Sequence, residues 1–564
     1  MKQNLFMRKQ ISFLCFLIFL FTGINSELLL AQDLGNIANE KPFKITGSFS
    51  ANAGFYSSKG FYSSKKPFTY SFLTAPVISI YGVQIPLNFS YTEGSGKVDN
   101  PFTQFGIDPY WKWIKVHAGY SNMSWSQGTL AGKTFLGAGI ELTPGKFRFG
   151  AMYGRLNAAV KQDSLKAVDP QYKRMGYAFK LGYGGAENYF DLIYLKGKDE
   201  INSIPKVENT ANFAPQENAV FGIVSRKTFF KNKLIWLSDA SASAFSRDLN
   251  SKELDLNQIK QQNQIRSVLV PRYSSGYSWM IHSNLVYKLS ALKLSADYMR
   301  VQPDYRSMGA DYFSTDFQRF QLGQGYTTKN RKVQIALSES YQHDDLAKNK
   351  LAKTHRGNSL VSFNFMPSAK MGLTLSYNTS LVFQSDGLKK VNEYSKINQL
   401  SQNILLSPRY TIFNTERVQN FLISAMYASL KDYNHVTSPF SESTTYNYNF
   451  VYSLSIIKKG VSITPSMNLL FNHLSAFKMK NYSPAVTFSQ TLLKTKMTAS
   501  ITTVFTMAFL NNLHTNNTIN IQPGVSYSLG KHHSFKGSFA WMHTDHSGYV
   551  SSESRGDVGY VFTF

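Results

Sequence analysis

Apolar and polar residues alternate in several long stretches of the chain. In YNYNFVYSLSI, residues 446–456, every second residue is apolar and most residues between them are Asn or Ser. A period of two is that of a β-strand with one apolar and one polar face. The same alternation occurs in 370–383, 496–510 and 519–529, so these segments are predicted to be strands.

The predicted strands are long, and their polar faces are unusual. They contain about ten residues or more, whereas strands of soluble sheets have a mode of ~5–6. Their polar faces carry mainly Ser, Thr, Asn and Gly instead of Lys and Glu. A tilted strand that crosses a bilayer needs ~9–11 residues, apolar toward lipid and polar toward the lumen. We therefore predict an all-β, transmembrane, antiparallel up-and-down β-barrel; an extracellular β-sandwich or β-helix is the alternative.

The connections between strands alternate between short and long, as they do in a membrane barrel. Short turns include TPGK (143–146), IKKG (457–460) and the turn that begins at Gly530, and the longer polar segments are 199–217, 247–276, 384–398 and 432–444. If the end at Phe564 faces the periplasm, all short turns lie on the periplasmic side. The expected number of strands is about 24 with a margin of two, because 110–120 and 133–142 both look like strands where one crossing is expected.

The chain ends on a strand with one apolar face. Val558, Tyr560, Phe562 and Phe564 share this face, which a ragged terminus would not bury. We expect this strand to close the cylinder against the first one, near 43–55. The terminal Phe564, with Tyr560 and Phe562 before it, resembles the C-terminal signal by which outer-membrane barrels are recognised by their insertion machinery. Over 43–564 the chain is similar to bacterial outer-membrane β-barrels at large, and no particular transporter family is indicated.

The N-terminus has the pattern of a secretory signal peptide. Basic residues precede an apolar run over 11–21, and small or polar residues follow it. Cleavage is expected after Ala31, or after Ser26, which gives a signal peptide over 1–31 and one barrel domain over 32–564, with strands from about residue 43. Cys15, the one cysteine, leaves with the leader, so the mature chain has no disulfide or thiolate chemistry. The Ala31-Gln32 pair and the Asn/Lys/Phe/Tyr-rich composition resemble proteins of the Bacteroidota, Gram-negative bacteria, and the expected location is the cell outer membrane.

The chain is strongly basic, with a formal net charge of +26. Many lysines lie at the short turns, where they would meet anionic lipid head groups or attract anions to the mouth of a pore. No nucleic-acid-binding motif accompanies the charge. The expected partners are outer-membrane lipid, lipopolysaccharide and the barrel-insertion machinery, and a protein partner stays open.

Six charged residues fall on the predicted lumen face by the alternation. They are Arg148, Lys180, Asp191, Lys293, Asp297 and Lys536. Because cations outnumber carboxylates among them, an open pore is expected to prefer anions mildly; such groups could equally pair across the lumen.

The sequence carries no motif that indicates an enzyme, a metal site or a cofactor. Neither G-x-S-x-G nor H-E-x-x-H occurs. HTDHS (543–547) and HDD (343–345) lie at expected outer strand ends, where a barrel hydrolase would keep acid–base groups or a metal could bind. We predict a pore or uptake channel; a non-conducting barrel serving as scaffold or subunit of a surface or secretion complex is the alternative, and a hydrolase ranks third.

Overall fold

The computed structural model describes residues 42–61, 63, 65–81, 83–92, 104–162, 169–205, 213–255, 266–310 and 314–564. The predicted signal peptide therefore lies outside the described residues. The first strands are β1 (Phe43–Thr46), β2 (Ser48–Lys59), β3 (Phe68–Thr74), β4 (Val77–Ile80), β5 (Val83–Thr92), β6 (Gln104–Ile107), β7 (Tyr110–Trp111), β8 (Ile114–Ser124), β9 (Ala131–Leu142), β10 (Phe147–Asn157), β11 (Arg174–Gly184), β12 (Tyr189–Asp199), β13 (Glu217–Phe229) and β14 (Leu234–Ser246).

The remaining strands are longer on average. They are β15 (Ser275–Lys288), β16 (Leu292–Val301), β17 (Phe317–Thr327), β18 (Val333–Asp344), β19 (Ala352–Phe365), β20 (Met371–Asp386), β21 (Asn398–Phe413), β22 (Arg417–Asp432), β23 (Ser443–Ile456), β24 (Val461–Leu474), β25 (Lys478–Leu492), β26 (Met497–Leu510), β27 (Leu513–Leu529), β28 (His533–His546) and β29 (Tyr549–Thr563). Two short helices, η2 (Ile201–Ser203) and α4 (Ser438–Ser441), lie in connections. No helix among the described residues is long and apolar enough to span a membrane.

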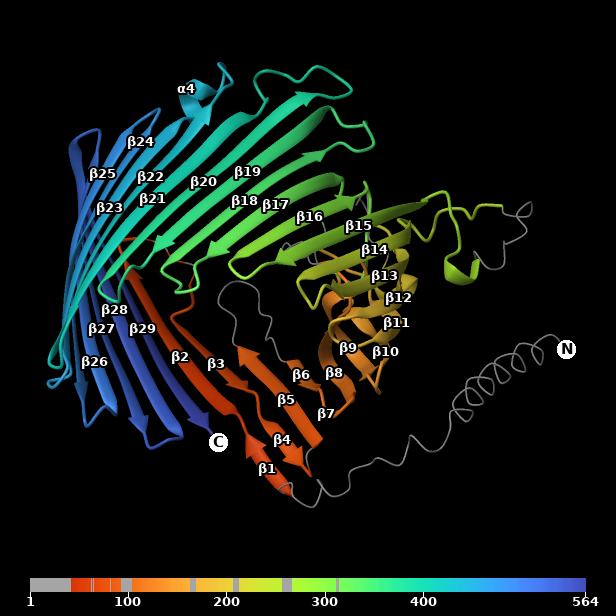
Figure 1. Ribbon diagram of the computed structural model, residues 1–564, viewed down its shortest axis with the longest axis horizontal. Helices are drawn as coiled ribbons and strands as arrows, with labels where there is room; N and C mark the ends of the chain where they lie inside the picture. Colours follow the sequence, from red (N-terminus) through yellow and green to blue (C-terminus); the bar gives the residue numbers. More distant parts are fainter. Residues whose placement is uncertain are drawn as a thin grey trace.

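The strands form one closed antiparallel circuit. From β8 to β29 each strand pairs with its neighbours in sequence, and β29 pairs with β2 from Ser48 opposite Thr563 to Lys59 opposite Ser552. The end of β29 lies beside β2 in Figure 1. Backbone hydrogen bonds of 3.0 Å in both directions between Gly47 and Phe564 complete this seam. The prediction of an antiparallel up-and-down β-barrel is confirmed.

The circuit has 26 strand positions within the described residues. Although 29 strands are present, β1 continues into β2, β3 into β4 and β6 into β7, each pair sharing one position. The ambiguous region resolves into a hairpin, because β8 and β9 pair along most of their length, while Tyr110 and Trp111 belong to the preceding position. This hairpin brings the number to the upper limit of the predicted 24 with its margin of two.

Short connections gather at one end of the barrel, which we call the turn end; the other end is the loop end. Connections at the turn end contain at most five residues. In the turn after β9, Gly145 has a positive φ of 61°, and Phe147 N donates to Pro144 O at 3.0 Å. Both β1 and the end of β29 lie at the turn end, as an even number of crossings requires. The last three connections at the loop end are also short, 475–477, 511–512 and 547–548.

One face of the wall exposes continuous rows of large apolar side chains. Phe149, Leu181, Leu192 and Ile223 lie side by side on β10–β13, and all four are exposed. Near the loop end, rings on β23–β27 contact one another in edge-to-face geometry: Tyr448, Phe471, Tyr482, Phe509 and His514. Such rows and belts suit contact with lipid and its interface. We call this the outer face.

The opposite, inner face is covered on one side of the barrel by two segments from the loop end. Residues 125–130 follow β8, and residues 302–310 follow β16; we call them the inner segments. Their contacts reach strands as far apart as β9 and β14. One short segment can reach both strands only if it crosses the concave, inner side of the wall. Buried apolar residues of the wall and the segments form two clusters here: Met123, Leu130, Phe135, Met152, Leu156, Ala178, Leu195, Val220, Phe245 and Met308; and Met280, Met299, Val301, Tyr305 and Phe317.

Candidate functional site: the inner face of the barrel

Arg148 and Asp191 form a two-pronged ion pair on the inner face. Arg148 Nε donates to Asp191 Oδ1 at 2.7 Å and Nη2 donates to Oδ2 at 2.9 Å. The pair spans β11, because Gly182 stands between the two residues in register. A Cβ on Gly182 would lie 1.9 Å from Asp191 Oδ1, so the glycine makes room for the pair. The Arg148 guanidinium also stacks 4.1 Å from the ring centre of Tyr189.

Lys180 belongs to a second charged group on the same face. Its Nζ lies 3.4 Å from Glu141 Oε2 and 5.1 Å from the ring centre of Trp125. Glu141 and Lys180 stand on either side of Gly150 in register, and a Cβ on Gly150 would lie 2.5 Å from Trp125. Trp125 Nε1 donates to Glu141 Oε2 at 3.2 Å. The indole therefore covers Gly150 and ties the first inner segment to the charged wall.

His117 extends this group to a second carboxylate. The imidazole is 1% exposed; its Nε2 lies 3.2 Å from Glu141 Oε1, and its Nδ1 lies 2.6 Å from Asp108 Oδ1. Ser121 Oγ donates to the same Asp108 oxygen at 2.6 Å. The result is a group of polar side chains that runs from the connection between β6 and β7 to β12. We call it the charged cluster: Asp108, His117, Glu141, Lys180, and the neighbouring pair Arg148 and Asp191.

The inner segments are fixed to the wall by buried hydrogen bonds. Ser126 Oγ donates to Asp239 at 2.9 Å, and Met308 N donates to Asn218 Oδ1 at 2.9 Å. Tyr305 Oη donates to Gly128 O at 2.6 Å, which joins the two segments. Burial raises the pKa of Tyr305, so its hydroxyl keeps its proton and remains a donor. The segments are built into the wall and narrow the lumen on this side.

Asp297 lies in a separate group further around the barrel. His282 Nε2 is 2.7 Å from Asp297 Oδ2, Asn284 donates to the same oxygen at 3.1 Å, and Arg319 donates to Oδ1 at 3.3 Å. Lys293 lies opposite Lys288 and Gly325, and Lys536 lies opposite Ser526 and Gly559. In the part of the chain that is described, no ion pair involves Lys293 or Lys536. The structure therefore brings Arg148, Lys180 and Asp191 together and leaves the other three predicted residues apart.

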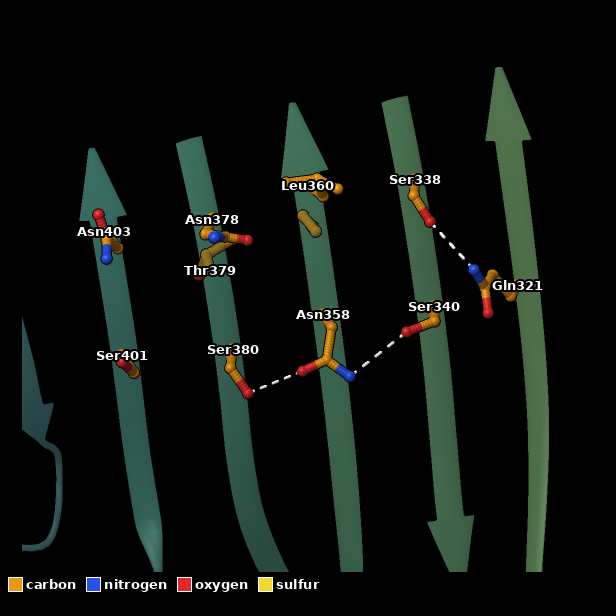
Figure 2. A pocket seen from close by; sticks show the side chains of 11 residues that line it. Gln321, Ser338, Ser340, Asn358, Leu360, Asn378, Thr379, Ser380, Ser401 and Asn403 are labelled. Carbon is orange, nitrogen blue, oxygen red and sulfur yellow. Dashed lines mark hydrogen bonds between the residues drawn. The ribbon is translucent and has the colours of Figure 1, made fainter. Parts of the chain in front are cut away.

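The inner face of the other side of the barrel is mainly polar. By register it carries Arg319, Arg356 and Arg409 on β17, β19 and β21, and among the described residues the strands β23–β27 present no charged side chain on this face. From β23 to β27 its hydroxyl and amide groups bond across strands: Asn468 to Asn447 at 2.8 Å, Thr464 to Ser453 at 3.1 Å, and Thr487 with Thr502 at 3.0 Å. Over β17–β21 the same chemistry lines a hollow of about 480 Å³. Figure 2 shows Asn358 between Ser340 and Ser380, joined at 3.3 and 2.7 Å, and Gln321 bonded to Ser338 at 3.1 Å. This surface is wettable and offers mainly uncharged hydrogen-bonding groups.

The aromatic residues of β29 near the C-terminus pack against side chains of the neighbouring strand β28. Tyr560 packs on Phe535 with ring centres 4.9 Å apart, and its hydroxyl lies 2.8 Å from His533 Nδ1. Phe562 contacts His533 at 4.9 Å and Phe564 at 5.5 Å. The role of Tyr560, Phe562 and Phe564 as an insertion signal stays a prediction.

The sequence alone did not indicate His117, Glu141, Trp125, Asp239 or the inner segments. One signal was present, because glycines occupy alternate inner positions in β9, as in LGAGIEL (136–142), and such glycines mark a close approach of other groups. Among the described residues, the histidines and acids of HTDHS (543–547) and of HDD (343–345) do not form a catalytic group. Within the described ranges no group of three His, Cys, Asp or Glu residues is placed to hold a metal ion.

No protein-family description matches the chain, and no curated protein matches it. Among solved structures, the ferric citrate transporter FecA in its unliganded form has a TM-score of 0.38 at 9% identity, covering 91% of this chain and 78% of FecA. BauA, the ferric preacinetobactin receptor of Acinetobacter baumannii, gives 0.37 at 9%, covering 92% and 81%. OccK10 (OpdN) of Pseudomonas aeruginosa gives 0.33 at 12%, covering 60% and 93%.

Likenesses of this size carry no information on substrate or activity. The fold follows from the chain itself, from its closed ring of long strands, its exposed apolar rows outside and its polar groups inside. The chain is thus a closed antiparallel β-barrel with an apolar outer face and a polar inner face.

Proposed function

We propose that the protein is an outer-membrane pore or uptake channel for small polar solutes, with a mild preference for anions. The observation that carries the proposal is the contrast between the two faces of one closed wall. The outer face exposes Leu181, Leu192 and Ile223 in a row, and burying such a row in lipid is favourable by about 25 cal/mol per Å² of apolar surface. The inner face presents hydroxyl, amide and charged groups that hold water.

The size of the ring supports a water-filled lumen. Barrels of 16–18 strands already leave an aqueous channel, and this circuit has 26 positions in its described part. Among the described residues the inner segments cover part of one side, so the polar wall over β23–β27 is the path that we propose for solutes. In this proposal residues 1–31 direct export and residues 32–564 form the barrel. The surrounding partners are outer-membrane lipid and lipopolysaccharide, and the insertion machinery acts during assembly.

Planar-bilayer conductance of the purified, folded protein tests the proposal. We expect single-channel steps and, across a salt gradient, a reversal potential of anion-selective sign that shrinks as salt rises, because the Debye length falls from ~30 Å at 0.01 M to ~10 Å at 0.1 M. The absence of steps from protein with normal heat-modifiable migration would contradict a pore. Steps with cation preference would leave the pore and contradict the anion preference.

A non-conducting barrel that serves as scaffold or partner subunit is the second candidate. The buried contacts of the inner segments favour it, since Tyr305 and Ser126 fix these segments across the lumen side of the wall. Replacing 304–309 by a short Gly-Ser connection separates the two candidates. A pore that the segments narrow should show a larger single-channel conductance, whereas a barrel that is closed elsewhere should stay silent. A hydrolase, the third candidate, would require a catalytic group that no contact among the described residues supplies.

A further inference from the structure

A pocket opens at the turn end of the barrel beneath the turn between β11 and β12. It has a volume of about 680 Å³ and lies among the ends of β11, β12 and β13. Its walls are the turn 184–188 and the side chains of Lys146, Tyr183, Tyr189, Phe190, Ser225, Arg226 and Lys227. The pocket thus combines cations, aromatic rings and turn backbone, and it adjoins the charged cluster at Tyr189, on which Arg148 stacks.

The outer-face part of the pocket is apolar. Tyr183, Phe190 and Ser225 lie side by side in register on three strands. Both rings are about half exposed, at 56% and 46%, and the small Ser225 leaves a gap beside Phe190. Two residues further from the turn end, the same face carries Leu181, Leu192 and Ile223. An apolar track therefore runs from the pocket along the wall.

The rim of the pocket is cationic. No ion pair or hydrogen bond within the described residues engages the side chains of Lys146, Arg226 or Lys227, and Arg226 Nε is buried without an acceptor. Arg226 lies opposite Tyr189 in register, on the inner face, so the cations that a ligand on the outer face can reach are Lys146 in the turn and Lys227. The one carboxylate of the pocket, Glu187, already accepts a hydrogen bond from Asn232 Nδ2 at 2.9 Å. Two lysines thus stand against one engaged carboxylate.

We propose that this pocket binds one phospholipid with an anionic head group. The phosphate would accept charge-assisted hydrogen bonds from Lys146 and Lys227, and the acyl chains would follow Tyr183, Phe190 and the apolar row beyond them. Aromatic side chains at the interface and basic groups at head-group level are the chemistry that recognises such a lipid. The inference rests on the proposed insertion of the barrel in a membrane, and it does not depend on whether the barrel conducts.

Native mass spectrometry of the delipidated full-length barrel in non-ionic detergent tests the site. The probes are phosphatidylglycerol, phosphatidylcholine and glycerol 3-phosphate. The test variant is Lys146→Gln with Lys227→Gln. The matched control is Lys494→Gln with Lys496→Gln, which removes two lysines from the turn between β25 and β26 at the same end. Heat-modifiable migration of each variant shows that the barrel has formed.

We expect one phosphatidylglycerol to bind per chain at low lipid concentration, and the test variant to bind it at least tenfold more weakly, since each cation near a membrane surface contributes a factor of roughly five. The control should bind like the wild type. Equal weakening in the control, or equal affinity for phosphatidylcholine, would overturn the site. Competition by glycerol 3-phosphate at the same concentration would also overturn it, by assigning the cations to a free phosphate compound. A silent barrel in planar bilayers that still binds the lipid would refute the pore and keep the site.

Discussion

Single glycines decide which charges can meet on the inner face. Gly182 stands between Arg148 and Asp191, and Gly150 stands between Glu141 and Lys180 beneath Trp125. In both places the missing side chain lets groups on the next-but-one strand reach each other. Trp125 of the first inner segment covers the Glu141–Lys180 pair, which lowers its contact with water and strengthens the attraction.

Gly182→Ala is expected to destabilise the barrel by about 3 kcal/mol, because the new methyl group would displace Asp191 and leave a buried pair broken. Unfolding in urea, followed by heat-modifiable migration, measures the change. Gly185→Ala in the neighbouring turn is the control; its Cβ would meet no atom within 4 Å, so its stability should change by less than about 0.5 kcal/mol. Equal effects of the two substitutions would show that the packing around Gly182 is irrelevant.

Lys293 and Lys536 are expected to contribute to the anion preference, because no ion pair among the described residues engages them, whereas Arg148 and Lys180 face carboxylates. Lys293→Gln with Lys536→Gln should shift the reversal potential in a salt gradient toward zero while leaving single-channel steps intact. Lys293→Arg with Lys536→Arg keeps both charges and should behave like the wild type. A neutral double variant with unchanged selectivity would assign the preference to the lysines at the turns.

At the scale of the strands, the period of two was readable from the sequence because both faces of each strand have a uniform environment. Residues 446–456 show this, because Tyr and Phe on one face are favourable in lipid and Asn and Ser on the other face are favourable in the lumen. The hairpin of β8 and β9 was ambiguous because its connection, 125–130, is short and has apolar residues at both ends, Trp125 and Leu130. It folds inward, where Ser126 and Thr129 are buried, so it lacks the length of the polar loops that separate other strands at the loop end.

The charged cluster could not be predicted as a cluster. Alternation places Arg148, Lys180 and Asp191 on one face, but their contacts depend on the register of β9–β12 and on two segments that lie far apart in sequence. Tyr305 and Gly128 meet although they are separated by 177 residues. No local sequence pattern predicts such a contact. The glycines on the inner face of the wall indicate only that another part of the chain packs closely against it.

The final strand is predicted to be sensitive at its last residue. Phe564 N and O both bond to Gly47, and its ring packs on Phe562. Phe564→Ser should therefore lower the amount of assembled barrel in the outer membrane severalfold, as measured by heat-modifiable migration of membrane fractions. Phe564→Tyr keeps an aromatic ring and is the control. Normal levels of the Ser variant would mean that the terminal ring is not needed for insertion or closure.

At the scale of the whole molecule, the sorting of short and long connections gives a direction relative to the membrane. The turn end carries both described ends of the barrel, and the loop end carries 247–274 and 387–397 between strands. Epitope tags inserted in 387–397 should bind antibody on intact cells, whereas tags in the turn 457–460 should bind only after the outer membrane is opened. The reverse pattern would overturn the orientation and keep the barrel.

The two sides of the lumen differ in how they interact with a solute. One side, over β8–β16, holds ion pairs and two fixed segments; the other is richer in hydroxyl and amide groups and, among the described residues, carries no charge on its inner face over β23–β27. In the proposed pore, a charged solute is expected to interact mainly with the first side, and a neutral polar solute with the second.

The pairing of β2 with β29 also determines when the barrel can close during its assembly. Hydrogen bonds join residues 47 and 564, so ring closure must wait until nearly the whole chain has been synthesised and exported. Until then both edge strands are open, and such edges invite association with other chains. Long-range pairing of this kind is slow. If the chain is exported as proposed, we expect it to depend on holding chaperones, and cells that lack them should lose this protein to proteolysis before they lose barrels of fewer strands.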